Sequence, residues 1–141
     1  MDMNFFMPVN IVFGKDCIKN NMSLFARYGK KCLIVTGKNG AKKSGALDDV
    51  VLALQSTETE YVIFDKIEQN PLYTTCNEAS DVAKEFGAEF IIGIGGGSPL
   101  DAAKAVAVLS ACKDTSADAL YSGKWDDVPL PIIAVGTTAG T

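Results

Sequence analysis

Two kinds of hydrophobic pattern alternate along the chain. Short, nearly continuous apolar runs are typical of buried strands, whereas apolar residues spaced three or four positions apart are typical of amphipathic helices. The runs predict strands at residues 9–13, 31–36, 60–64, 90–94 and 132–135. The helical spacing predicts one helix that Asp16 caps and Gly29 ends, one that starts at Ser44, one within 71–86 and one at 100–110. Residues 111–129 form a polar connection that we expect to be partly loop.

This alternation of strands and helices predicts an α/β fold. Strands that alternate with helices form a parallel sheet with right-handed crossovers. We therefore expect a Rossmann-like parallel sheet with helices on both faces. The loops that follow the strands gather at one edge of such a sheet, and open α/β sheets bind ligands there. That edge receives residues 37, 95–98 and 137–138, which predicts a single nucleotide crevice.

Three consecutive glycines, Gly95, Gly96 and Gly97, follow the apolar run at 90–94 and precede a helix. Glycine lets the backbone approach a ligand that a side chain would hold away. The N-terminus of the helix behind the turn offers N–H donors and a positive dipole end to a phosphate. The G-x-G-x-x-G fingerprint is incomplete, because Ser98 stands at the third glycine position. A tight turn without a ligand is therefore the alternative interpretation.

The helix after the glycines carries two charged candidates in its first two turns. We expect Ser98 to be its N-cap, with Pro99 as the first helical residue and Asp101 as the third. Capping alone would explain Asp101, although a role in a cofactor site is compatible with it. Lys104 is the lone charge in an apolar helix, and its stem can extend to the surface or reach a cofactor.

Size and charge narrow the class of protein. A chain of 141 residues with 48% hydrophobic residues is typical of one compact domain. A net charge of −4 argues against nucleic acid or an anionic membrane as the main partner. No apolar run approaches the ~20 residues of a membrane span, and the first residues lack the basic start of a signal peptide. We therefore expect a cytoplasmic protein.

Metal-binding residues are scarce. The chain has no histidine, and its four cysteines include no C-x-x-C pair. A Cys/His metal site is therefore not predicted, and four reduced, mostly buried thiols are the better interpretation.

The motif Gly95-Gly96-Gly97-Ser98-x-x-Asp101-x-x-Lys104 resembles the nucleotide-binding signature of the iron-containing (group III) alcohol dehydrogenases. Residues 9–14 resemble the N-terminal strand of that family, Asn70-Pro71 its Asn-Pro loop, and 132–141 its Thr-Thr-Ala-Gly-Thr segment. The resemblance covers essentially the whole chain. Gly136 departs from it, because members often carry proline there.

The resemblance implies that residues 1–141 are an N-terminal dinucleotide-binding domain, truncated at its C-terminal end. The family holds its iron(II) with one Asp and three His in an all-helical C-terminal domain, which is expected to be absent here. The intact enzyme would transfer hydride between NAD(P)H and a small alcohol or aldehyde, and the isolated chain would be inactive. No catalytic residue and no metal ligand is assigned to this chain. A homodimer paired through the N-terminal strand is also possible.

The expected cofactor-binding residues lie at the strand ends, in the glycine turn or in the Asn-Pro loop. The resemblance, together with the position of residues 37, 95–98 and 137–138 at one sheet edge, implies cofactor binding by Gly37, Lys38, Asn39, Asn70, Pro71, Gly95, Gly96, Gly97, Ser98, Asp101, Lys104, Thr137, Thr138 and Thr141. The threonine hydroxyls suit adenine or phosphate contacts, although Thr137 and Thr138 also suit a strand end.

The residue after the strand at 31–36 bears on the choice of cofactor. NAD-selective enzymes commonly place a carboxylate at such a strand end to bind the adenosine 2′-hydroxyl. Gly37 stands there instead, and Lys38, Lys42 and Lys43 are nearby. This pattern favours NADP, while NAD remains possible and the lysines can also be a solvated helix start.

Two other functions remain open. Dehydroquinate synthases share the two-domain architecture and a glycine-rich turn, so a lyase domain is one alternative. A stand-alone nucleotide-binding module with a regulatory or structural role is the other.

Overall fold

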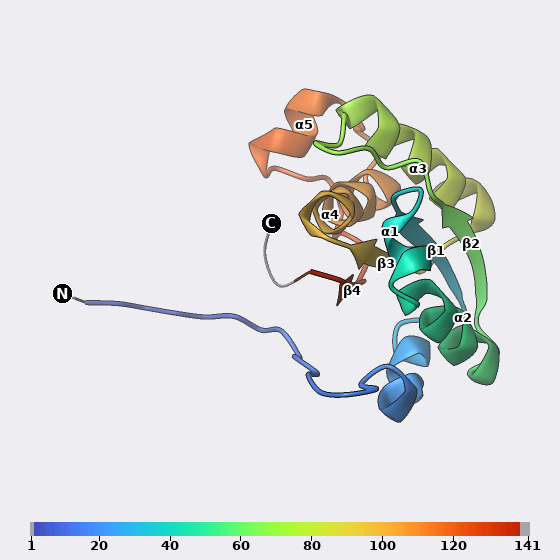
Figure 1. The fold of residues 1–141 in the computed structure, drawn as a ribbon. Helices are drawn as coiled ribbons and strands as arrows, with labels where there is room; N and C mark the ends of the chain where they lie inside the picture. The colour runs from blue at the N-terminus through green and yellow to red at the C-terminus, as the bar shows by residue number, and fades with distance from the viewer. Residues whose placement is uncertain (1, 139–141) are drawn as a thin grey trace.

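The structure is a computed structural model in which residues 2–138 are described. Four parallel strands form one sheet in the order β2-β1-β3-β4 (Figure 1). The strands are β1 (Lys31–Thr36), β2 (Glu60–Phe64), β3 (Phe90–Gly95) and β4 (Ile132–Gly136). The helices are η1 (Lys19–Ala26), α1 (Gly40–Lys43), α2 (Ala46–Ser56), α3 (Tyr73–Phe86), α4 (Gly97–Ala111) and α5 (Ala117–Ser122). The predicted Rossmann-like α/β fold is confirmed.

The two central strands are the most deeply buried part of the molecule. Every residue of β3 and all of β1 after Lys31 are buried. A strand that is covered on both faces has no polar side to show, so its sequence is a continuous apolar run rather than an alternation. This is why the pattern located both strands.

Helices cover both faces of the sheet (Figure 1). On one face, α3 and α4 pack against alternate residues of the strands, such as Leu33 and Ile91. On the other face, η1, α1 and α2 pack against the intervening residues, such as Ile34 and Ile92. Side chains alternate between the faces of a strand, so each central strand contributes to both hydrophobic clusters.

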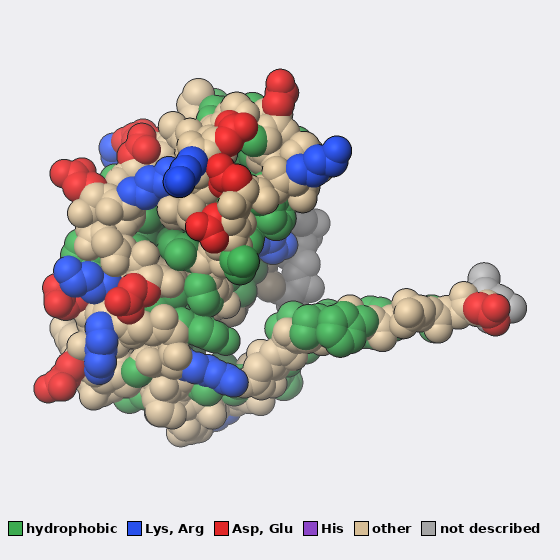
Figure 2. Space-filling view, turned by 180° about the vertical axis from the view of Figure 1, so that it is seen from behind, with side chains coloured by type: hydrophobic (Ala, Val, Ile, Leu, Met, Phe, Trp, Pro, Cys, Tyr) green, Lys and Arg blue, Asp and Glu red, His purple; other side chains and the backbone are tan. Residues whose placement is uncertain are grey.

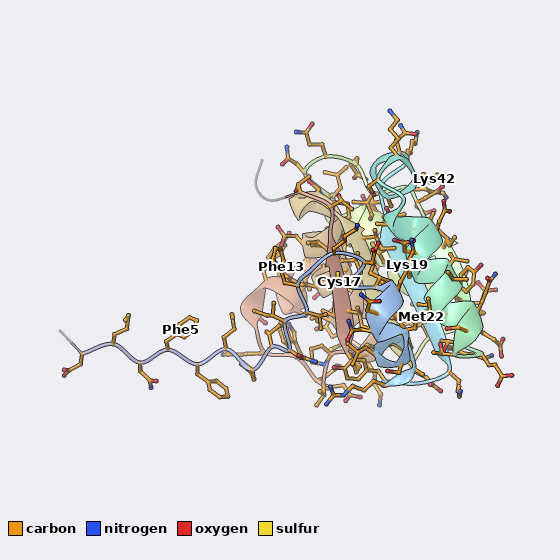
Figure 3. The ribbon with its side chains drawn as sticks, turned by 60° about the horizontal axis from the view of Figure 1, so that its bottom comes forward. Phe5, Phe13, Cys17, Lys19, Met22 and Lys42 are labelled. Atoms are coloured by element: carbon orange, nitrogen blue, oxygen red, sulfur yellow. The ribbon has the colours of Figure 1, made fainter. Side chains whose placement is uncertain are left out.

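The predicted strand at residues 9–13 is wrong. These residues belong to no strand and lie in an extended arm that leaves the body of the domain (Figure 3). Its apolar side chains are open to solvent, with Phe5 77% and Phe13 98% exposed, and Figure 2 shows apolar side chains along the arm. Apolar alternation favours a strand only where another strand can pair with it, and no described segment pairs with this one.

Several helix boundaries also differ from the prediction. The first helix is a 3₁₀ helix, and Asn21 interrupts it with non-helical dihedrals. The short helix α1 was not predicted, and α2 starts at Ala46 after Gly45, which has a φ of 79°. Within the predicted connection, α5 forms because Ser116 caps it, accepting a hydrogen bond from the Ala119 amide at 3.1 Å.

Candidate functional site

The glycine turn joins the carboxyl end of β3 to the N-terminus of α4. Gly95 is the last residue of the strand, Gly97 is the first of the helix, and Gly96 alone lies between them. The predicted N-cap is wrong: Gly96 is the N-cap, and its carbonyl accepts a hydrogen bond from Leu100 N–H at 3.3 Å. The helix therefore begins two residues earlier than predicted, because the apolar pattern starts only at Leu100, and Ser98 lies within its first turn.

The three glycines meet different surroundings. Gly95 has a φ of 148°, and a Cβ there would lie 2.7 Å from the Pro99 ring. At Gly96 a Cβ would lie 3.2 Å from the Thr138 hydroxyl oxygen. At Gly97 it would meet no described atom within 4 Å. The fold therefore requires glycine at Gly95, whereas Gly97 leaves open space beside the backbone of the helix N-terminus.

The helix N-terminus beside this open space is suited to binding an anion. The first N–H groups of a helix have no partner within the helix, and the dipole of α4 adds partial positive charge there. Gly97 and Ser98 supply such N–H groups, whereas Pro99 has none. The turn can therefore offer backbone donors to a phosphate without a side chain in the way.

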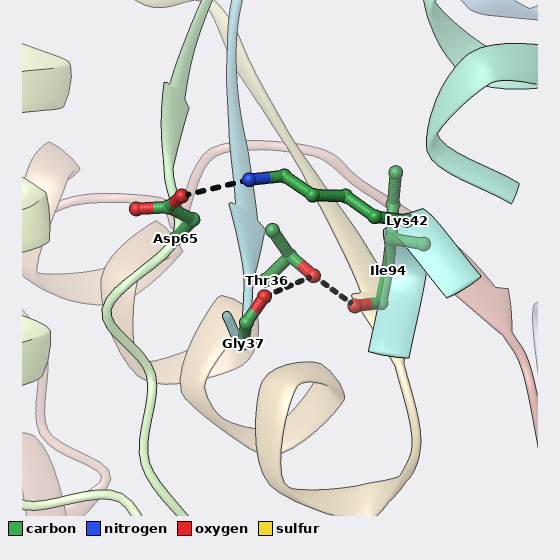
Figure 4. A network of polar contacts seen from close by, with 5 residues as sticks. All are labelled: Thr36, Gly37, Lys42, Asp65 and Ile94. Atoms are coloured by element: carbon green, nitrogen blue, oxygen red, sulfur yellow. Dashed lines mark hydrogen bonds and ion pairs between the residues drawn. The ribbon is translucent and has the colours of Figure 1, made fainter. Parts of the chain in front are cut away.

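A buried threonine ties this turn to the end of the neighbouring strand. Thr36, the last residue of β1, is 1% exposed, and its hydroxyl donates to the Ile94 carbonyl at 2.9 Å (Figure 4). The chain leaves β1 towards β2 on one side, while β3 lies on the other. The carboxyl ends of β1 and β3 thus form the topological switch point at which open α/β sheets bind ligands. Directly after β1, the chain continues at this switch point with Gly37, Lys38 and Asn39.

The end of β4 lies beside the same turn. Thr137 N–H donates to the Gly95 carbonyl at 2.9 Å, and the Thr138 side chain lies beside Gly96. The structure therefore brings both threonines to the glycine turn, as expected. Thr141 lies outside the described residues.

The Asn-Pro loop also reaches the turn. Asn70 has a positive φ of 54°, and its backbone N–H donates a hydrogen bond to the Ser98 hydroxyl, with 3.4 Å between the nitrogen and the oxygen. Sequence reasoning missed the residue that shapes this loop: the Glu68 carboxylate accepts hydrogen bonds from Leu72 N–H at 3.1 Å and from the Thr75 hydroxyl at 2.8 Å. Hydrogen bonds from its own amide, then from Thr75 and Leu72, lower the pKa of Glu68.

Asp101 and Lys104 lie further along α4. Their side chains form an exposed ion pair of 3.0 Å. Together with Pro71 they line a pocket of about 330 Å³ between α3, α4 and α5, whose walls include Tyr73 and Trp125. The structure thus groups these two charges with Pro71 of the Asn-Pro loop.

The lysines after β1 include one that is paired. Lys38, Lys42 and Lys43 are all exposed, and Lys42 forms an ion pair of 3.3 Å with Asp65, the first residue after β2. Sequence reasoning missed Asp65 because it considered the carboxylates that follow Gly37 along the chain and not those of the neighbouring strand. The available signal was its position, directly after the predicted strand at 60–64.

The described residues do not fit an iron site. They contain no group of three His, Cys, Asp or Glu side chains that could hold a metal ion. Burial raises the pKa of Cys32 to about 12 and also raises the pKa values of Cys76 and Cys112, which makes these thiols poor ligands and nucleophiles. Among the described helices, none combines the length and the hydrophobicity that crossing a membrane requires.

Known proteins resemble this chain over nearly its whole length. The profile of a family described as iron-containing alcohol dehydrogenase matches residues 8–141. The long-chain primary alcohol dehydrogenase AdhA of Thermoanaerobacter ethanolicus is 44% identical over 126 residues, which are 88% of this chain and 32% of that protein. The NADH-dependent butanol dehydrogenase B of Clostridium acetobutylicum is 32% identical over all of this chain and 36% of its own length.

The fold agrees with these matches. A crystal structure of an iron-containing alcohol dehydrogenase from Thermotoga maritima superposes with a TM-score of 0.92 at 40% identity, covering 98% of this chain and 38% of that one. This chain therefore spans about a third of the length of the curated relatives that it matches.

Proposed function

Because the chain belongs to the family of iron-containing alcohol dehydrogenases, we propose that its residues 1–141 are a dinucleotide-binding domain. The domain binds NADP(H), and less tightly NAD(H), at the carboxyl edge of the sheet. It serves an enzyme that transfers hydride between the cofactor and an alcohol or aldehyde. The observation that carries this proposal is the glycine turn at the switch point between β1 and β3, with open space beside Gly97.

The pyrophosphate of the dinucleotide is proposed to lie against the turn. The backbone N–H groups of Gly97 and Ser98 donate to its oxygens, and the missing side chain of Gly97 keeps the approach clear. Thr137 and Thr138 contribute hydroxyl groups from the end of β4. When bound, the nicotinamide supplies the hydride acceptor or donor, and this chain contributes binding and orientation.

The other proposed contacts surround this centre. Asn70 and Pro71 approach the turn from the side of Ser98, and Asp101 and Lys104 extend that wall along α4. At the end of β1, Gly37, Lys38 and Asn39 face the adenosine end. Because Gly37 has no carboxylate to repel a 2′-phosphate, and because Lys38 and Lys43 are exposed cations, NADP(H) is the preferred cofactor.

Substrate chemistry requires a metal that this chain is not built to hold. The chain has no histidine, and its described residues offer no metal-ligand cluster. We therefore expect the isolated chain to show no alcohol oxidation even with added ferrous iron. Measurable turnover by homogeneous protein would contradict this expectation. The family match favours an oxidoreductase over a lyase related to dehydroquinate synthase.

A titration of NADPH fluorescence with the protein tests the binding proposal. The Gly96→Val variant places a branched side chain against Thr138 in the turn proposed to hold the pyrophosphate and is expected to abolish binding. Gly96 has extended dihedrals of −82° and −158°, which any residue adopts, so the variant is expected to keep the far-UV circular dichroism of the parent. Equal NADPH affinity of variant and parent would mean that the turn is only structural.

A homodimer is proposed as the assembly in solution, because the apolar arm at residues 3–13 is exposed beside the edge strand β4. Sedimentation equilibrium tests this, and a monomer at micromolar concentration would contradict it.

A further inference from the structure

The segment that follows β2 is held against the end of β1. Ile67 N–H donates to the Thr36 carbonyl at 3.2 Å. The backbone is so close that a Cβ at Gly37 would lie 3.1 Å from the Ile67 carbonyl oxygen. Asp65, the first residue of this segment, is therefore fixed beside Gly37, at the strand end where the adenosine is proposed to bind.

Asp65 engages a cation from the opposite side of Gly37. The Lys42 ammonium on α1 lies 3.3 Å from the Asp65 carboxylate, and Figure 4 shows the Lys42 side chain extending across the end of β1 to reach it. The two side chains are 56% and 45% exposed, so both can exchange partners with a solute.

This ion pair alters the electrostatic reasoning about the cofactor. A 2′-phosphate is attracted by cations and repelled by carboxylates, whereas a ribose 2′-hydroxyl can donate to a carboxylate. With Lys42 bound to Asp65, one of the three nearby lysines is neutralised. The Asp65 carboxylate also lies close to the end of β1, where Gly37 stands in the place at which NAD-selective enzymes carry a carboxylate.

We propose that Asp65 is a specificity-determining residue that restrains Lys42 and thereby limits the preference for NADPH over NADH. This inference rests on the proposed function, since it presupposes that the adenosine binds beside Gly37. It differs from that proposal in assigning the cofactor choice to the first residue after β2, a strand that lies two strands away from the glycine turn.

The test compares NADPH and NADH affinities of the parent and of Asp65→Asn by isothermal titration at low ionic strength. The substitution keeps the shape of the side chain and releases Lys42. An exposed ion pair has a strength that corresponds to about a two- to fivefold change, so NADPH affinity is expected to rise by that factor while NADH affinity stays the same or falls. Asp65→Asn is a sharper test than Gly37→Asp, because an added side chain at Gly37 would press on the Ile67 carbonyl.

Two further variants isolate the role of the pair. Asp49→Asn breaks the comparably exposed Lys19–Asp49 pair, 3.4 Å long and formed between η1 and α2, and is expected to change neither affinity. In a Lys42→Met background, the gain from Asp65→Asn is expected to shrink to the part that comes from removing the repulsion between the Asp65 carboxylate and the 2′-phosphate, because Lys42 is no longer there to be released.

The possible results separate the two proposals. An unchanged NADPH-to-NADH ratio in Asp65→Asn, or an undiminished gain in the Lys42→Met background, overturns the inference while the binding proposal stands. A protein series that binds neither dinucleotide overturns the proposed function, and the inference falls with it.

Discussion

Gly95 and Gly97 lie two residues apart in one turn, yet they differ in whether the described structure has room for a side chain. A side chain at Gly95 would clash, whereas one at Gly97 would not. Gly95 has a positive φ and abuts Pro99, so the fold alone explains why it is glycine. Gly97 is the first residue of a helix and faces open space, where alanine would suit the described structure at least as well. Because no described atom requires glycine at position 97, we propose that a ligand approaches the backbone there.

The largest effect on stability is expected at the first of these positions. Gly95→Ala combines backbone strain with a Cβ 2.7 Å from Pro99, and the two costs together are about 2–5 kcal/mol. Urea denaturation followed by circular dichroism measures the loss. An unchanged midpoint would show that Gly95 is not a requirement of the fold, and the contrast with Gly97 would fail.

The next largest effect on stability is expected at the hydrogen bond that joins the ends of β1 and β3. Thr36→Val keeps the shape of the side chain but removes its hydrogen bond to the Ile94 carbonyl, at a cost of about 1 kcal/mol. Because this bond holds the end of β1 against the end of β3, NADPH affinity is also expected to fall.

A matched variant separates the two effects. Thr59→Val removes a hydroxyl that is also buried and that bonds to Thr57, before the start of β2 and away from the crevice. It is expected to lower stability by a similar amount and to leave NADPH affinity unchanged. If both variants bind equally well, the Thr36 bond has no part in shaping the site.

The hydrophobic pattern located the core of this fold because β1 and β3 are buried on both faces, which leaves a continuous apolar run in the sequence. It failed at residues 9–13, where a strand depends on a partner that the pattern cannot reveal. It also misplaced the start of α4, because the cap is a backbone conformation at Gly96 and not a polar side chain.

The candidate site also contains residues that the sequence could predict and residues that it could not. Turn residues such as Gly96 and Thr138 follow strands in the sequence, so their convergence at one edge could be predicted. The position of Asp65 directly after a predicted strand was a signal, but its pairing with Lys42 depends on the strand order β2-β1-β3. Glu68 could not be assigned, because its role depends on a loop that folds back on itself.

A smaller effect on stability, which depends on pH, is expected for Glu68 in the Asn-Pro loop. Because the pKa of Glu68 is lowered in the folded chain, its ionised form stabilises the fold above the ordinary carboxyl range. This contribution is lost as pH falls through the lowered pKa. Glu68→Gln should therefore be less stable than the parent at pH 7, and the difference should shrink below about pH 4.5. A difference that is constant with pH would exclude the ionised carboxylate as the cause.

The smallest effect on stability, and the most direct test of the central claim, is expected for Gly97→Ala. The added methyl group at the start of α4 meets no described atom within 4 Å, so the free energy of unfolding should be unchanged or slightly higher. The same methyl group occupies the proposed approach of the pyrophosphate. NADPH affinity should therefore fall by at least about tenfold, or 1.4 kcal/mol. Fluorescence titration of NADPH, run beside urea denaturation of the same samples, measures both quantities. Undiminished NADPH affinity in a stably folded Gly97→Ala protein would contradict the account.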